Sequence, residues 1–267
     1  MAEIIAIANQ KGGVGKTTTA VNVSAALAQT GQRVCLIDLD PQSHASLHFG
    51  VEPGPEVKTL YDVLVDKASL ADVRLQVAEN LWLVPSSLDL AAAEVELAGV
   101  VGREIILRDK LGEDDLEVDY LLMDCPPSLG VLTLNALASV EEVFIPLQPH
   151  FLALHGLSKL LETIDLVARR LNSRLKLSGV ILCMYDVNTR LAAEVSQDVD
   201  KFFHNARGQK TPWAATQTFQ TRIRRNIRLA EAPSFGQSIF QYAPASTGAE
   251  DYRQLAHEIL AGVTAVA

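Results

Sequence analysis

Residues 9–19 read Asn-Gln-Lys-Gly-Gly-Val-Gly-Lys-Thr-Thr-Thr, and this stretch decides which fold the chain can adopt. An apolar run at 4–8 precedes it and is typical of a buried strand, while helix-favouring residues follow at 20–28. A strand, a glycine-rich turn and a helix in this order are the setting of a phosphate-binding loop. The glycines let the backbone curl so that its N–H groups point at phosphate oxygens, and the helix N-terminus adds partial positive charge.

The loop supplies residues suited to a nucleotide and its cation. Lys16 is expected to reach the β- and γ-phosphates, and the Thr17 hydroxyl is expected to hold Mg²⁺. The predicted nucleotide-binding residues of the loop are Lys11, Gly12, Gly13, Val14, Gly15, Lys16, Thr17 and Thr18. The competing interpretation is a glycine-rich turn with incidental lysines, and the flanking strand and helix argue against it.

This loop departs from the common pattern G-x-x-x-x-G-K-[ST], because Gln10 stands where that pattern has its first glycine. A second lysine, Lys11, precedes Lys16 instead, which gives the deviant Walker A form K-G-G-x-G-K-T-T. One loop needs only one lysine for its own phosphates. Lys11 is therefore expected to point out of its own site.

Composition favours one α/β domain over residues 1–267. The net charge is −9, so a nucleic-acid site would have to be a local basic patch. Cys35, Cys125 and Cys183 are far apart without C-x-x-C spacing, which favours buried reduced thiols over a disulfide framework or a zinc site. No signal peptide precedes the first strand, and no apolar run reaches the ~18 residues of a membrane helix. These features predict a cytoplasmic protein.

Apolar runs recur along the chain with helix-like segments between them. We expect strands at 4–8, 34–37, 81–84, 120–123, 143–147, 179–184 and 238–242. Nearly continuous apolar runs are typical of strands buried on both faces. The sequence therefore predicts a mostly parallel twisted sheet with helices on both faces, of the P-loop NTPase type, with its ligand at the carboxyl ends of the strands.

Carboxylates follow two of these strands at the predicted ligand-binding edge. Asp38 and Asp40 end the strand at 34–37, and Asp124 ends the strand at 120–123 in the run Asp-Cys-Pro-Pro-Ser. An acid in the position of Asp124 serves Mg²⁺ directly or through water in phosphate-transfer sites. A lone acid at a strand end is more often a helix N-cap or a turn residue. Its combination with the glycine-rich loop favours the metal-binding interpretation.

These motifs together resemble those of the ParA/MinD family of deviant Walker ATPases. Residues 11–18 match its Walker A motif, residues 38–42 its A′ motif and residues 124–128 its Walker B motif. The run Arg-Asn-Ile-Arg-Leu-Ala-Glu-Ala-Pro-Ser-Phe-Gly at 225–236 is similar to the chromosomal, Soj-like branch of ParA proteins. The resemblance covers essentially the whole chain.

The resemblance implies an ATP hydrolase that uses ATP and Mg²⁺ and forms an ATP-dependent homodimer. In such a dimer Lys11 would cross the interface to the partner's nucleotide, and Gly12 would leave room for the partner subunit. Asp40 would position or activate the attacking water, so the implied catalytic residues are Lys11, Lys16 and Asp40. Thr17, Asp124 and Asp38 would support the magnesium ion, with Asp38 bracing the loop or the metal shell. Asn226 would help to hold the adenine.

Residues 222–228 read Arg-Ile-Arg-Arg-Asn-Ile-Arg and form a cationic patch in an acidic chain. Guanidinium groups suit phosphate because they donate in a fixed fork. The resemblance implies non-specific DNA binding by Arg222, Arg224, Arg225 and Arg228, with Arg190 as a further candidate. The alternative is a solvated surface with ion pairs, or arginines that serve the nucleotide or the dimer interface. Arg224 stands where the family usually has proline.

The leading functional hypothesis is a nucleoid-associated ATPase that positions or segregates a chromosome, a plasmid or a protein cluster. Its expected partners are a second copy of itself, non-specific DNA and a ParB-like or other cargo adaptor that stimulates a weak hydrolysis. The alternative is a membrane-associated regulator of the MinD type, but residues 255–263 lack the lysines and arginines of a membrane-binding helix. An iron–sulfur reductase would need two loop cysteines per subunit, and only Cys125 lies near a strand end.

Overall fold

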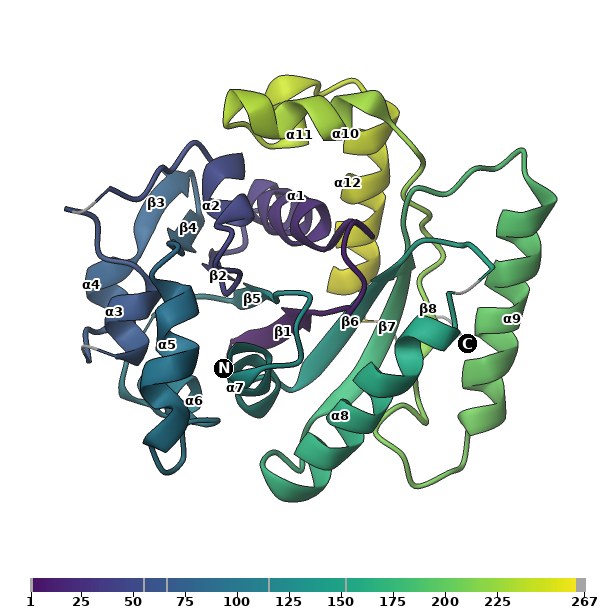
Figure 1. The fold of residues 1–267 in the computed structure, drawn as a ribbon. Helices are drawn as coiled ribbons and strands as arrows, with labels where there is room; N and C mark the ends of the chain where they lie inside the picture. Colours follow the sequence, from purple (N-terminus) through teal and green to yellow (C-terminus); the bar gives the residue numbers. More distant parts are fainter. Residues whose placement is uncertain (1, 55, 66, 115, 152, 263–267) are drawn as a thin grey trace.

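The computed structural model describes residues 2–54, 56–65, 67–114, 116–151 and 153–262 (Figure 1). Within them a sheet of eight strands has the order β3-β4-β2-β5-β1-β6-β7-β8. The strands are β1 (Glu3–Ile7), β2 (Val34–Asp38), β3 (Leu75–Ala78), β4 (Leu81–Val84), β5 (Tyr120–Asp124), β6 (Glu142–Leu147), β7 (Lys176–Leu182) and β8 (Gln217–Thr218). Neighbouring strands run parallel, except that β3 pairs antiparallel with β4. The predicted fold class is confirmed.

Helices cover both faces of this sheet (Figure 1). The α-helices are α1 (Lys16–Gln29), α2 (His44–His48), α3 (Leu60–Leu64), α4 (Leu70–Val73), α5 (Leu90–Glu96), α6 (Ile106–Glu113), α7 (Val131–Ser139), α8 (Ser158–Arg170), α9 (Arg190–Ala206), α10 (Ile227–Glu231), α11 (Ile239–Tyr242) and α12 (Thr247–Leu260). Short 3-10 helices are η1 (Leu97–Gly99), η2 (His155–Leu157) and η3 (Ala232–Phe235).

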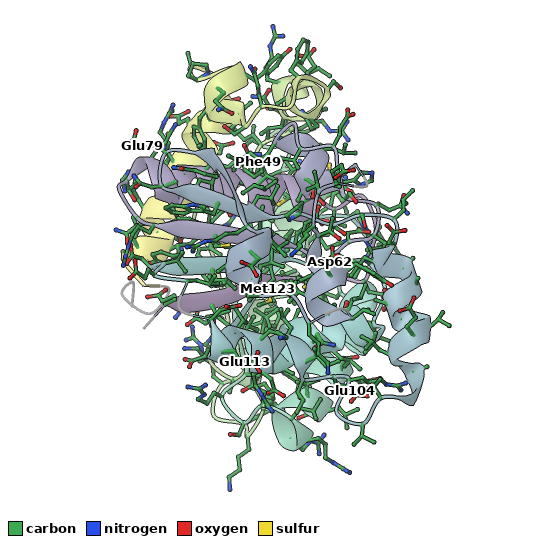
Figure 2. All side chains as sticks on the ribbon, turned by 90° about the vertical axis from the view of Figure 1, so that its left-hand side faces the viewer. Phe49, Asp62, Glu79, Glu104, Glu113 and Met123 are labelled. Carbon is green, nitrogen blue, oxygen red and sulfur yellow. The ribbon has the colours of Figure 1, made fainter. Side chains whose placement is uncertain are left out.

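Alternate residues of the central strands belong to two separate apolar clusters, one on each face. In β1, Ile5 and Ile7 pack with residues of α1 and α12, whereas Ala6 belongs to the cluster that includes α7 and α8. In Figure 2, Met123 of β5 lies between the layer that holds Phe49 and the lower layer that holds Glu113. The continuous apolar runs of the sequence therefore reflect burial on both faces, as expected for parallel strands.

The predicted strand at 238–242 is wrong, because residues 239–242 form helix α11. Ser238 begins this helix with a capping box, in which the Ser238 backbone N–H donates to the Gln241 side chain at 3.0 Å. The capping box therefore gives the Ser238 N–H an acceptor within the helix. In a strand, this N–H would have donated to a neighbouring strand. The edge strands β3 and β8 were not predicted, since β3 is half-exposed and β8 has only two residues.

The predicted strand at 179–184 is displaced by a few residues. β7 begins at Lys176 and ends at Leu182, so Cys183 and Met184 lie beyond the sheet. Met184 has a φ of 51°, which turns the chain away from the strand direction. Before this turn, the Cys183 side chain lies 3.6 Å from a Cβ added to Gly15, so the end of β7 is next to the glycine-rich loop.

Substitution of Gly179 by alanine should destabilise the fold. A Cβ on Gly179 would lie 2.2 Å from the Phe219 ring, which is buried and packs edge-on against Phe144. We expect a decrease of about 1–3 kcal/mol in the free energy of unfolding, because the buried ring has to shift. Urea denaturation measures this change.

Gly112 provides the matched control, because it lies in α6 with no heavy atom within 4 Å of an added Cβ. Gly112→Ala should stabilise the protein by about 0.5–1 kcal/mol, since alanine restricts the unfolded chain in a helical position. Equal stability changes for Gly179→Ala and Gly112→Ala would contradict the packing described for β7.

Candidate active site

The glycine-rich loop joins β1 to α1 and lies at the carboxyl end of the sheet. Gly13 and Gly15 have φ values of 71° and 94°, a region that favours glycine. Asn9 fixes the start of the loop, because its Nδ2 donates to the Pro146 carbonyl at 2.8 Å and its Oδ1 accepts from the Lys11 N–H at 3.0 Å. Asn9 opens the glycine-rich stretch, but its residue type alone did not indicate this role. Its side chain ties the loop to β6.

Lys16, the first residue of α1, is 7% exposed. Its Nζ donates to the Lys11 carbonyl at 3.1 Å. Burial lowers the pKa of Lys16, while the carboxylates of Asp124 and Asp40 act in the opposite direction. An ammonium group removed from water in this way is stabilised by an anion placed beside it, as expected for a phosphate-binding lysine.

Asp124 ends β5 and is completely buried, with neither carboxylate oxygen hydrogen-bonded in the described part of the chain. Burial raises the pKa of Asp124 well above its usual range, and repulsion from Asp38 adds to this. Asp38 is its direct partner across the β2–β5 pair. The nearby Thr17 side chain and Lys16 favour the charged form. An unpartnered buried carboxylate is costly unless a cation or donor completes it.

This environment fits a hard divalent cation that keeps other oxygen ligands. Magnesium is usually bound through one or two protein groups together with water and phosphate oxygens. No cluster of three His, Cys, Asp or Glu side chains within the described ranges could enclose a metal ion by itself. The Asp124 carboxylate and the Thr17 hydroxyl are thus suited to a cation that arrives with a phosphate ligand.

Asp38 differs from Asp124, because its carboxylate is saturated with hydrogen bonds. Oδ1 accepts from the Asp40 N–H at 3.1 Å, and Oδ2 accepts from the Ser46 N–H at 2.9 Å and from its hydroxyl at 2.8 Å. Burial nevertheless raises the pKa of Asp38 to about 6. The Ser46 hydroxyl oxygen also accepts from the Ser86 N–H at 3.0 Å, which links this corner to the end of β4. These contacts agree with the bracing role expected for Asp38, and its magnesium role stays a prediction.

Asp40 lies two residues after the end of β2. It is 8% exposed, and its Oδ1 accepts from the Gln42 N–H at 3.0 Å. Its charge partly offsets the lowering of the Lys16 pKa by burial, as expected for two groups of one site. A carboxylate that is 8% exposed and belongs to the same site as Lys16 is suited to holding a water molecule.

A cavity of about 500 Å³ adjoins the glycine-rich loop. Its floor includes Gly13, Gly15 and Thr18, and one wall is the segment 223–227. Asn226 belongs to this wall, but its side chain is engaged: Oδ1 accepts from the Arg228 N–H at 2.8 Å, and Nδ2 donates to the Thr247 hydroxyl at 2.7 Å. Asn226 therefore shapes the wall as the N-cap of α10, and its expected contact with the adenine stays a prediction.

The arginines of the basic segment have different environments. Arg224 is bound to Asp251 and Glu250 of α12, and Arg222 donates to the backbone carbonyls of Phe219 and Gln220. These intramolecular bonds make both arginines poorer candidates for DNA contact than the sequence suggested.

Three other arginines remain at the surface. Arg228 is exposed and pairs with Glu231 at 2.8 Å. Arg225 and Arg190 are exposed, and neither side chain has an ion pair within the described residues. Arg190 is the first residue of α9, far along the chain from the segment. The cationic surface is therefore smaller than four arginines in sequence imply.

The beginning of the loop faces outward. Lys11 is exposed, and its ammonium group contacts His150, which follows β6. Burial and the charge of Lys11 both lower the pKa of His150. A Cβ added to Gly12 would have no neighbour within 4 Å. Nothing in its own described chain explains why position 12 is a glycine.

The three cysteines are buried free thiols, as predicted. Burial raises the pKa of Cys35 and of Cys183 to about 12, which keeps both protonated. Thiols in this state are poor metal ligands. In the described residues no helix is both long and apolar enough to cross a bilayer.

The sequence of this chain is similar to those of known proteins. Residues 2–177 match the family model described as an AAA domain. The sporulation initiation inhibitor protein Soj of Bacillus subtilis (strain 168) is 45% identical over 262 residues, which cover 98% of this chain and 99% of that protein. The chromosome partitioning protein ParA of Caulobacter vibrioides (strain NA1000 / CB15N) is 42% identical over 260 residues, which cover 96% of this chain and 93% of that protein.

Two solved structures have a similar fold. Cobyrinic acid a,c-diamide synthase from Mycobacterium smegmatis with bound ATP analog and magnesium has a TM-score of 0.82 and 34% identity, and the match covers 98% of this chain and 95% of that one. The cell division ATPase MinD of Pyrococcus furiosus has a TM-score of 0.76 and 26% identity, and the match covers 97% and 99% of the two chains.

Removal of the Ser46 hydroxyl should destabilise the protein, and more so at higher pH. Ser46→Ala removes one donor to Asp38 and leaves the buried Ser86 N–H without its acceptor, which we expect to cost about 1–3 kcal/mol. The pKa of Asp38 is raised from 3.8 to about 6 by folding, so stability falls as pH rises through this window. The Ser46 hydroxyl favours the charged form of Asp38, so the cost of removing it should be full above about pH 6 and smaller at lower pH.

Urea denaturation at about pH 5 and about pH 8 measures the difference. Ser24→Ala is the control, because Ser24 is equally buried and its hydroxyl has no partner among the described residues. Its effect should be small and independent of pH. A cost of Ser46→Ala that is the same at both pH values would show that Asp38 does not change its protonation state in this range.

Proposed function

Since this chain belongs to the Soj/ParA family of chromosome-partitioning ATPases, we propose that it hydrolyses ATP in order to position or segregate a cargo. One observation carries the proposal: the buried loop lysine and an unpartnered buried carboxylate lie at one sheet edge, beside a cavity of about 500 Å³. The similar Mycobacterium smegmatis structure, with its bound ATP analog and magnesium, supports ATP as the ligand. The protein is proposed to act as a single domain over residues 1–267.

Each residue of the site has a role in this proposal. The loop N–H groups from Gly12 to Thr18 and the Lys16 ammonium bind the phosphates. Thr17 and Asp124 would hold Mg²⁺, which neutralises phosphate charge when bound. Asp40 positions the attacking water, because its carboxylate is in the same site as Lys16 and keeps a small exposed fraction. Asp38 holds the backbone of Asp40 through its hydrogen bond, so it acts on the reaction indirectly.

The ATP-bound state is proposed to be a homodimer in which two loops face each other. Lys11 is exposed at the start of its loop, so it can reach across to the partner's phosphates as a positive charge supplied in trans. The unfilled space at Gly12 supports this arrangement, because the partner subunit would occupy it. Hydrolysis is then weak until an adaptor of the ParB type stimulates it.

The dimer is proposed to bind DNA without sequence preference and so to associate with the nucleoid. The exposed Arg225 and Arg228 provide the phosphate contacts, with Arg190 as an additional one. One subunit offers few contacts, and a dimer doubles them on one rigid body. The cargo is a chromosome, a plasmid or a protein cluster attached to the adaptor.

A MinD-type membrane regulator is the second candidate, supported by the structural similarity to the Pyrococcus furiosus protein. Membrane binding of that kind needs a free amphipathic helix near the C-terminus. Here the apolar face of α12, with Leu255, Ala256 and Ile259, is buried in the core against α1. Residues 263–267 lie outside the described residues. We therefore favour the DNA-binding function.

Gly12→Val should give a folded protein that binds ATP as a monomer. The side chain fits within one chain, since no heavy atom lies within 4 Å of an added Cβ, but it would occupy the space of the second subunit. Light scattering with a slowly hydrolysed ATP analogue measures the mass. Gly54→Val, where the Cβ is also unobstructed, is the control and should dimerise as the wild type does. A normal dimer of Gly12→Val would place the interface elsewhere and remove the trans role of Lys11.

Charge reversal at Arg225 and Arg228 should abolish DNA binding and spare dimerisation. Removal of each arginine–phosphate interaction should also lower the slope of log affinity against log salt by about one unit. Affinity for random duplex DNA is measured with and without ATP across a salt series. The control is Arg170→Glu with Arg174→Glu, which changes net charge equally at exposed positions near the amino end of β7.

Two outcomes would contradict this assignment. Wild-type protein that does not bind DNA with ATP at low salt would exclude the nucleoid as its matrix. Binding that survives the reversal would place the DNA surface elsewhere, with Arg190 as the next position to test.

A further inference from the structure

Arg224 makes more strong polar contacts than the other arginines of the basic segment, and all of them are with α12. Its Nε donates to both oxygens of Asp251, at 2.9 and 3.1 Å, and its terminal nitrogen donates to Asp251 at 2.5 Å and to Glu250 at 2.9 Å. The Arg224 backbone N–H also donates to Asp251 at 2.9 Å. The Asp251 side chain is only 4% exposed, whereas the Arg224 side chain is 37% exposed, so the carboxylate of this ion pair is buried and the guanidinium stays partly in solvent.

The backbone that Arg224 holds is a wall of the cavity beside the glycine-rich loop. Ile223, Arg224, Arg225, Asn226 and Ile227 all line this cavity. The wall is joined on its other side to the chain after β7, because the Tyr185 N–H donates to the Ile223 carbonyl and the Arg225 N–H donates to the Tyr185 carbonyl. The wall is therefore an extended segment held from two sides.

Helix α12 connects this wall to the phosphate end of the site. Thr247 of α12 accepts from the Asn226 side chain, one turn before Asp251. Tyr252 lines the same cavity and is fully buried, and its hydroxyl lies 3.2 Å from that of Thr19 in α1. α1 begins at Lys16, so one helix contacts both the wall and the helix that carries the loop.

We propose that Arg224 is a positioning residue for the nucleotide base: its pairing with Asp251 fixes the cavity wall against α12. This inference rests on the proposed function, in which the phosphates occupy the loop and the base occupies the cavity. It assigns Arg224 to nucleotide recognition rather than to DNA. A proline at this position would lack both the guanidinium and the backbone N–H that bind Asp251.

Removal of the Arg224 side chain leaves the Asp251 carboxylate buried with only the backbone donor, and the wall is freed from its main attachment to α12. The phosphate loop is not touched by this change. Binding of a ligand that has only phosphates should therefore be spared, whereas binding of a nucleotide should weaken. A general disruption of the folded structure would instead weaken the binding of both ligands together.

The test is calorimetric titration of ATP and of inorganic tripolyphosphate, each with Mg²⁺, into wild type and Arg224→Ala at a temperature where both are folded by circular dichroism. We expect ATP affinity to fall about ten-fold and tripolyphosphate affinity to change less than about two-fold. Arg224→Lys keeps the positive charge but loses the two-pronged donor geometry of the guanidinium, so it should give an intermediate ATP affinity. Arg253→Ala is the control, since Arg253 lies on the same helix but contacts Pro244 and Phe240.

A double-mutant cycle with Asp251→Asn locates the effect in the pair. The double variant should bind ATP only slightly more weakly than Arg224→Ala alone, because both changes break the same ion pair. The proposal would be overturned if the effects of the two substitutions on the free energy of ATP binding were fully additive. It would also be overturned if Arg224→Ala left ATP affinity unchanged, or lowered the affinities for ATP and tripolyphosphate equally. Arg224→Ala could instead keep the wild-type ATP affinity and fail to bind DNA at saturating ATP. That result would assign Arg224 to the DNA-binding surface. Wild-type protein that binds tripolyphosphate but not ATP would refute the proposed function itself.

Discussion

Burial of charge at the carboxyl edge of the sheet is the constraint on which the rest of this structure depends. Asp38 and Asp124 are withdrawn from water at the ends of the neighbouring strands β2 and β5, and Lys16 is withdrawn from water at the start of α1. Charges in such places need partners. Asp38 obtains them from Asp40 and Ser46, and these bonds shape the corner after β2. Asp124 and Lys16 remain incompletely satisfied, so the site is prepared for a ligand that brings both negative charge and a cation.

The two faces of the sheet contribute differently to the site at this edge. The face with α1 and α12 carries the glycine-rich loop, the cavity and the wall at 223–227. The other face is a broad apolar cluster with α7 and α8 that supports the central strands from behind. Because parallel strands end together at one edge, residues from four distant parts of the sequence meet there. The fold thus determines the position of the site, and the side chains of the loops at this edge determine which ligand it can bind.

Position within the sheet edge also separates residues that look alike in sequence. Asp38 and Asp124 both end strands and are paired across β2 and β5, yet one is saturated and the other is open. Arg224 and Arg225 are adjacent, yet one is bound to α12 and the other faces solvent. In both cases the difference comes from what the neighbouring element offers. Such a difference decides whether a charged group stabilises the fold or is available to a ligand.

Local pattern by itself determined the loop, the parallel sheet and the acids at its edge. The glycines and lysines of residues 9–19 need only their flanking strand and helix, and runs such as 120–123 are apolar because both faces are buried. Short or amphipathic segments gave weaker signals. Residues 238–242 were misassigned because a capping box between Ser238 and Gln241 outweighs the strand preference of Ile239 and Phe240.

Only the tertiary structure decided the partners of individual side chains. Nothing near Arg224 in the sequence indicates that its guanidinium would bind Asp251, far along the chain, and so not be free to bind DNA. The roles of Asn9 and Ser46 were equally hidden, because Pro146 lies in β6 and Ser86 lies just after β4, both far along the chain. Sequence spacing specifies the secondary structure and the ends of strands, whereas hydrogen bonds between distant segments depend on the three-dimensional packing that brings them together.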